Sequence, residues 1–166
     1  MKNNHLIPAV LVFLIVCQTA ITAQNNEPAL NQLELMKQFT GKWQSEPGKD
    51  TIEIWDNHLY GNSIIMEVSL VVKGKRSDYY INNTGFDIRD GKLKGYILQT
   101  DASYSTWIGL FTTPVKLSVM VVDELNRDKL FGMIDFDFIN ASTVIKTDFT
   151  KEGLAMGRHK FTKVKL

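Results

Sequence analysis

Hydrophobic and polar residues alternate along most of this chain, from Gly41 to its C-terminus, in short runs separated by Gly, Asn and Asp. Alternation with a period of two is typical of half-buried antiparallel strands, and the separating residues favour tight turns. Closing such a series of strands removes its unpaired edges. The pattern therefore predicts an all-β, up-and-down antiparallel barrel of about 8 to 10 strands over residues 41–166.

The positions of the turns predict which side chains face the barrel interior, because a two-residue loop pairs the residues that flank it. Loops at Lys73-Gly74, Asp90-Gly91 and Ala141-Ser142 fix the register of three hairpins. The residues predicted to face inward have odd numbers after the first turn, at Tyr79 and Ile81, but even numbers before the second, at Phe86 and Ile88. We therefore expect a bulge or break within residues 82–85. The side chains predicted to face inward are Met66, Val68, Tyr79, Ile81, Phe86, Ile88, Ile134, Phe136, Phe138, Ile145 and Phe149.

Loop length decides the orientation of side chains in two further hairpins. A two-residue loop before the last strand would turn Arg158 and Lys160 toward the core, which is unfavourable for charged groups. A three-residue loop with Gly153 in the left-handed conformation avoids this and turns His159 inward. The orientation of Trp107 stays open, because a two-residue loop in its hairpin places the ring outside and a three-residue loop places it inside.

A short helix is predicted just before the barrel, over residues 29–39, with Asn26 as a possible cap. It precedes Gly41-Lys42-Trp43, and this order, followed by a meander of strands and a basic last strand, resembles the lipocalin and fatty-acid-binding superfamily, the calycins. The likeness covers about residues 33–166 and is most specific to uncharacterised bacterial secreted lipocalin-like domains. It implies that Trp43 closes one barrel end beneath a cation of the last strand, with Arg158 the first candidate and Lys160 and Lys163 as competitors.

The same resemblance implies a small apolar or amphipathic ligand bound in the barrel mouth, where pockets of such folds lie. A barrel packed solid is the alternative, and it would suit a non-enzymatic envelope or interaction protein with outer aromatics such as Tyr96 and Trp107 meeting a partner. His159 adds a third option, because a lone inward histidine could bind haem iron, as in the nitrobindin barrels, or could simply be a wall residue. The residues expected to border a ligand are Met66, Tyr79, Ile81, Phe86, Phe138, Ile145, His159 and Phe161.

Other chemistry finds little support in the sequence. After the first 23 residues the chain contains two histidines, His58 and His159, and no cysteine, so a His/Cys metal cluster is not expected. No nucleophile or nucleotide-binding motif is present, and the balanced charge argues against nucleic acid as a partner. Glu53 and the group Asp135, Asp137 and Asp148 are predicted on the outer wall. The three aspartates are expected to form a solvated face offset by Lys146 and Arg158, with a weak calcium site as the alternative. A cofactor and an oligomeric state are not indicated.

The N-terminus has the features of a secretory signal. Lys2 precedes an apolar run from Leu6 to Val16 that is too short to span a bilayer, and a small residue, Ala23, marks the expected cleavage site. Cleavage there would remove Cys17. The sequence thus predicts a protein exported to the periplasm or secreted, without a stable membrane span.

Overall fold

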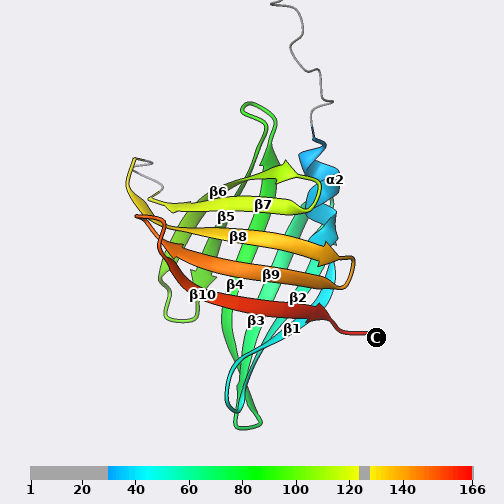
Figure 1. The fold of residues 1–166 in the computed structure, drawn as a ribbon, viewed down its shortest axis with the longest axis vertical. Helices are drawn as coiled ribbons and strands as arrows, with labels where there is room; N and C mark the ends of the chain where they lie inside the picture. Colours follow the sequence, from blue (N-terminus) through cyan, green and yellow to red (C-terminus); the bar gives the residue numbers. More distant parts are fainter. Residues whose placement is uncertain (1–29, 124–127, 166) are drawn as a thin grey trace, which may run out of the picture.

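The computed structural model describes residues 30–123 and 128–165. Within them ten strands form one closed antiparallel barrel, in which each strand pairs with the next and β10 pairs with β1 (Figure 1). The prediction of an all-β up-and-down barrel is confirmed. The strands are β1 (Gly41–Gly48), β2 (Thr51–Tyr60), β3 (Ser63–Val72), β4 (Lys75–Asp87), β5 (Lys92–Gln99), β6 (Tyr104–Thr113), β7 (Lys116–Val122), β8 (Leu130–Asn140), β9 (Thr143–Thr150) and β10 (Ala155–Lys163).

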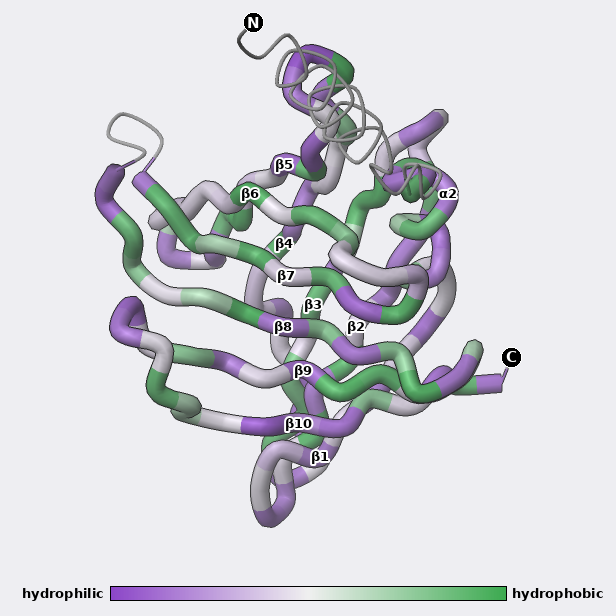
Figure 2. The backbone as a smooth tube through the Cα atoms, turned by 45° about the horizontal axis from the view of Figure 1, so that its top comes forward, coloured by the Kyte–Doolittle hydropathy of each residue, from purple (hydrophilic) through white to green (hydrophobic). Residues whose placement is uncertain are grey.

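Side chains alternate between the two faces of the wall along these strands, and Figure 2 shows the matching alternation of hydrophobic and hydrophilic positions. The signal sequence, its cleavage site, Cys17 and the expected cap Asn26 lie outside the described residues. No helix in the described part of the chain is long and apolar enough to cross a membrane. The predicted inward positions that the structure confirms are Met66, Val68, Phe86, Ile134, Phe136 and Phe138.

A short helical segment closes one end of the barrel. It consists of α2 (Gln32–Met36) and the 3-10 turn η1 (Lys37–Phe39), and Figure 1 shows α2 next to the barrel end at which β8 finishes. The observed N-cap is Asn31, whose side chain accepts the backbone N–H of Glu34 at 3.2 Å, so α2 begins later than the predicted residue 29. The segment is tied to β6, because the Gln32 amide bonds both the N–H and the carbonyl of Phe111, at 2.7 and 3.0 Å.

Aromatic rings fill the barrel next to this plug. Phe39 packs edge-on against Phe136 and Phe138, with ring centroids 5.2 and 4.8 Å apart. Trp55 stacks on Phe161 with centroids 3.5 Å apart. These contacts bury large apolar surfaces, which is the main source of stability in a barrel without disulfides.

Trp43 lies at this end and is fully buried. Its indole N–H and the side-chain amide of Asn57 both donate to the carbonyl oxygen of Phe39, at 2.8 and 2.7 Å. The cation above the Trp43 ring is Lys163, whose Nζ lies 5.0 Å from the ring centroid. The first candidate, Arg158, is instead exposed, because a bulge in β10 turns it to the outer face.

The β3–β4 hairpin corrects the first predicted register. Its two-residue turn is as expected, but Val68 pairs with Tyr80 instead of Tyr79, since a bulge lies at this point. The bulge thus occurs several residues before the predicted region 82–85. Beyond it the faces are reversed, so Ile81 is 42% exposed on the outer wall and Tyr80 faces inward.

The β4–β5 hairpin has a longer loop than predicted. Asp87 pairs with Lys92 and Phe86 with Leu93, which leaves residues 88–91 as a four-residue loop. Ile88, predicted to face inward, is therefore in that loop and 86% exposed. Gly91 still takes a positive φ of 69°, so the turn glycine was identified but not the loop length.

The β8–β9 hairpin contains a second unpredicted irregularity, between Phe138 and Asn140. Phe138 pairs with Val144 there, and Val144 is fully buried. Ile145 and Phe149 consequently face outward, contrary to the prediction.

The β9–β10 and β5–β6 hairpins, for which loop length was decisive, both have three-residue loops. Gly153 has a φ of 85°, and Phe149 pairs with Ala155 as predicted. A bulge between Ala155 and Gly157 then places His159 opposite Lys146, still on the inner face. In the other hairpin the backbone N–H of Gln99 bonds the Ser103 carbonyl at 2.9 Å, which gives a three-residue loop and turns Trp107 inward.

Candidate functional site

A cavity of about 350 Å³ lies inside the barrel. It extends from the helical plug toward the opposite end of the strands. Its volume is within the range of small-molecule sites, and such sites combine an apolar lining with a few polar groups. The residues that border it are Met36, Phe39, Glu53, Trp55, Ile64, Met66, Tyr79, Tyr80, Asn82, Thr84, Leu93, Ile97, Gln99, Ser105, Trp107, Leu117, Val119, Val121, Ile134, Phe136 and Lys146.

The part of the cavity near α2 is apolar. Met36 and Phe39 of the plug form its floor, and Trp107 forms part of its wall. The Trp107 ring fits there because its neighbour Gly95 has no side chain, since a Cβ at Gly95 would lie 2.6 Å from the ring. The indole N–H of Trp107 donates to Oδ1 of Asn82 at 2.9 Å, which fixes the ring and satisfies its one donor.

The part of the cavity away from α2 is polar. Glu53, Tyr80, Gln99, Ser105 and Lys146 border it from five different strands. On β2, β5 and β6 the polar residue lies further from the plug than the apolar lining residues of the same strand, as Glu53 does relative to Trp55. The cavity is therefore amphipathic, with its polar groups gathered at one end.

The two charged residues of the polar end have different partners. Lys146 Nζ pairs with Asp148 at 2.9 Å on the same strand, and both side chains are largely buried, at 19% and 23% exposed. Glu53 Oε1 accepts the indole N–H of Trp55 at 2.8 Å. The Lys146 charge is thus offset by a carboxylate, whereas the structure gives Glu53 no ion-pair partner among residues 30–123 and 128–165.

Tyr80 is a further polar group of this end. Burial raises the pKa of its phenol well above the usual range, and the nearby carboxylates of Glu53 and Asp148 contribute in the same direction. The phenol therefore stays neutral and keeps its O–H donor at physiological pH.

Of the residues predicted to border a ligand, two border the cavity. Met66 does so from β3, and Tyr79 does so although 43% of its surface is exposed. The other predicted positions do not contribute, since Ile81 and Ile145 face outward and the remaining side chains pack elsewhere. Those that pack in the core away from the cavity are Phe86, Phe138 and Phe161.

His159 lies on the inner face but outside this cavity. It borders a separate surface depression together with Gln44, Ser45 and Glu46. The histidine packs beside Gly157, where an added Cβ would be 3.1 Å from Nε2. His159 is therefore not one of the residues that border the cavity.

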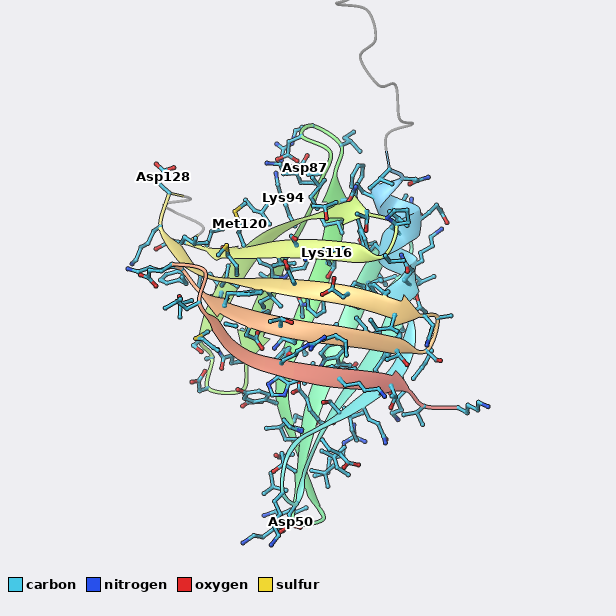
Figure 3. The ribbon with its side chains drawn as sticks, in the orientation of Figure 1. Asp50, Asp87, Lys94, Lys116, Met120 and Asp128 are labelled. Carbon is cyan, nitrogen blue, oxygen red and sulfur yellow. The ribbon has the colours of Figure 1, made fainter. Side chains whose placement is uncertain are left out.

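The polar end was missed from the sequence. Glu53 and Asp148 were predicted on the outer wall, but β2 and β9 turn them inward. Asp135 and Asp137 do lie outside, where they pair at 2.7 and 3.8 Å with Lys116, which is labelled in Figure 3. On β9 both faces mix polar and apolar residues, so the alternation by itself carried no signal for Lys146 or Asp148.

Other kinds of site are not supported by the described residues. No group of three or more His, Cys, Asp or Glu side chains is arranged to hold a metal ion in residues 30–123 and 128–165. No model of a known protein family matches the chain, and no curated protein matches its sequence. The closed ten-strand antiparallel barrel is consistent with the calycin architecture in general.

Proposed function

We propose that this protein binds one small amphipathic molecule inside the barrel. The observation that carries the proposal is the 350 Å³ cavity with an apolar floor at the plug and polar groups at the other end. An apolar body would gain by leaving water for the surfaces of Met36, Leu93 and Trp107, and a polar head would meet Glu53, Tyr80 or Lys146.

The alternatives have less support. A barrel packed solid would leave no space of this size between its walls. Haem binding through His159 would need that ring in the cavity, and no histidine is among the described residues that border it. A role as an interaction protein would use aromatic side chains on the outer wall. Tyr96 is exposed there, but Trp107 is buried and forms part of the cavity wall.

We also propose that the protein acts outside the cytoplasm. The support is the sequence of the first 23 residues, with Lys2, the apolar run and Ala23. N-terminal sequencing of the protein from its own host tests this: we expect the mature chain to begin at Gln24, and recovery of Met1 in the soluble cytoplasmic fraction would contradict export.

Binding is tested with a neutral fluorescent probe, N-phenyl-1-naphthylamine, and a pair of matched variants. Ile97→Phe adds a ring from a residue that borders the cavity, whereas Ile81→Phe adds the same ring on the outer wall. We expect saturable binding to the wild type, a loss of at least tenfold in affinity for Ile97→Phe, and no change for Ile81→Phe. Equal probe binding by all three proteins would contradict the proposal. Native mass spectrometry of the protein from its own host would give the mass of the natural ligand.

A further inference from the structure

The charges at the polar end indicate what kind of head group the cavity selects. This step rests on the proposed binding function and concerns the ligand's chemistry. Among the described residues, the charged side chains that border the cavity are Glu53 and Lys146. Both are carried by strands of the wall, so their positions are set by the barrel and not by a loop.

Lys146 is not free to bind an anionic ligand. Asp148 lies two residues further along β9 on the same face, and its Oδ1 is 2.9 Å from the Lys146 ammonium. An anionic head group would have to displace this carboxylate or approach it closely, and like charges repel strongly in a site partly shielded from water. A fatty acid is therefore poorly matched to this end of the cavity.

Glu53 has the opposite property. One of its oxygens accepts the Trp55 indole N–H at 2.8 Å, which holds the carboxylate in place, but the described part of the chain supplies no cation to neutralise it. Tyr80, Gln99 and Ser105 border the same space and offer neutral hydrogen-bonding groups. A partly buried carboxylate is costly unless a cation compensates its charge.

We infer that the cavity selects an amphiphile with a protonated amine, whose ammonium group pairs with Glu53 while its apolar body lies against the floor formed by the plug. The aromatic side chains near this end, Tyr79 and Tyr80, suit such a head group, because ring faces attract cations. The ammonium would also offset the negative charge that Glu53 and Asp148 place around Tyr80.

The test uses three probes with the same eight-carbon chain: octylamine, sodium octanoate and 1-octanol. Isothermal titration calorimetry at pH 7 compares their dissociation constants, since at this pH the amine is protonated and the acid is ionised. A hydrogen bond to a charged group is worth enough to give octylamine an advantage of about tenfold or more over octanol. Octanoate should bind more weakly than octanol.

The first variant, Glu53→Gln, removes the charge and keeps an amide oxygen to accept the Trp55 N–H. We expect octylamine to lose its advantage over octanol in this variant. Glu67→Gln is the matched control on the outer face of β3, and it should keep the amine preference. A second variant, Asp148→Asn, releases Lys146 from its partner and should shift the preference toward octanoate.

The outcomes separate this inference from the binding function. Octanoate binding as tightly as octylamine to the wild type, or an amine preference that survives Glu53→Gln, would overturn the inference and leave the amphiphile cavity in place. Failure of all three probes and of the naphthylamine to bind would overturn the proposed function, and the head-group selection with it.

Discussion

The two ends of the barrel are built on different principles. At the plug end, ring packing around Phe39 is combined with directed hydrogen bonds, since the donors of Trp43 and Asn57 converge on the Phe39 carbonyl. At the other end, charged and polar side chains such as Glu53 and Lys146 line a cavity. Dense packing stabilises a fold, whereas polar groups that border open space are available to a ligand.

This division assigns stability to the plug end and recognition to the polar end. It predicts that substitutions near α2 change the free energy of unfolding, whereas substitutions such as Glu53→Gln change ligand affinity with little effect on folding. Each of the following variants would contradict this division if its effect were the opposite of the one expected.

Phe161→Ala should give the largest loss of stability. Phe161 is fully buried and stacked on Trp55, so its removal leaves a cavity that the rigid wall cannot fill. We expect a loss of about 3 to 5 kcal/mol in the free energy of unfolding, measured by urea denaturation. The control, Phe131→Ala, removes an exposed ring of β8 and should cost well under half as much. Equal effects would show that the plug end is not the stabilising region.

Gly95→Ala tests the boundary between the two ends. The added Cβ would clash with the Asn83 carbonyl oxygen and would lie 2.6 Å from the Trp107 ring, so the wall or the ring must move. We expect a loss of about 1 to 3 kcal/mol, typical of overpacking, with a shift in tryptophan fluorescence as Trp107 moves. Gly48→Ala is the control, because nothing lies within 4 Å of its added Cβ. An unchanged spectrum and stability in Gly95→Ala would contradict the close packing of Trp107.

Gln32→Ala tests how firmly the plug is held. The variant leaves the N–H and carbonyl of Phe111 without their buried partner, which should cost about 1 to 3 kcal/mol. Gln38→Ala removes a single exposed bond to the Pro114 carbonyl and should cost less. Hydrogen exchange of the Phe111 amide provides a local measurement, and we expect faster exchange only in Gln32→Ala.

The sequence predicted the architecture well because alternation and turn residues are local signals. The left-handed Gly153 and the inward Phe136 and Phe138 follow from them directly. Bulges are different, because one extra residue reverses every later side chain on a strand while leaving the alternation unchanged. The bulge beside Tyr80 and the one before Asn140 therefore misplaced the predicted ligand contacts.

The polar end of the site could not be predicted from local sequence patterns, for the same reason. Lys146 and Asp148 are two residues apart on one strand and form an ion pair, an arrangement that would suit an outer, solvent-facing wall equally well. Only the closed barrel, with Phe138 opposite Val144, determines that this face of β9 points inward. The prediction of a ligand-binding barrel and the choice of its contacts thus depended on different information.

The smallest expected effect concerns the tip of the β4–β5 hairpin, where Asp87 and Lys94 lie together (Figure 3). Asp87 accepts hydrogen bonds from Arg89, at 2.7 and 2.9 Å, and from Lys94 at 2.7 Å, and these bonds hold the pKa of its carboxyl well below the usual range. A carboxyl whose pKa is lowered by folding adds stability at neutral pH, and that contribution is lost as acid protonates it in the folded state.

Asp87→Asn should therefore lower the midpoint of urea unfolding slightly at pH 7, and this difference should shrink as the pH falls below about 4, the pKa of an unfolded aspartate. In a Lys94→Gln background the effect of Asp87→Asn should be smaller at pH 7, because one of the bonds is already absent. A difference between Asp87→Asn and the wild type that grows on acidification would show that the hairpin charges oppose folding at this end of the barrel.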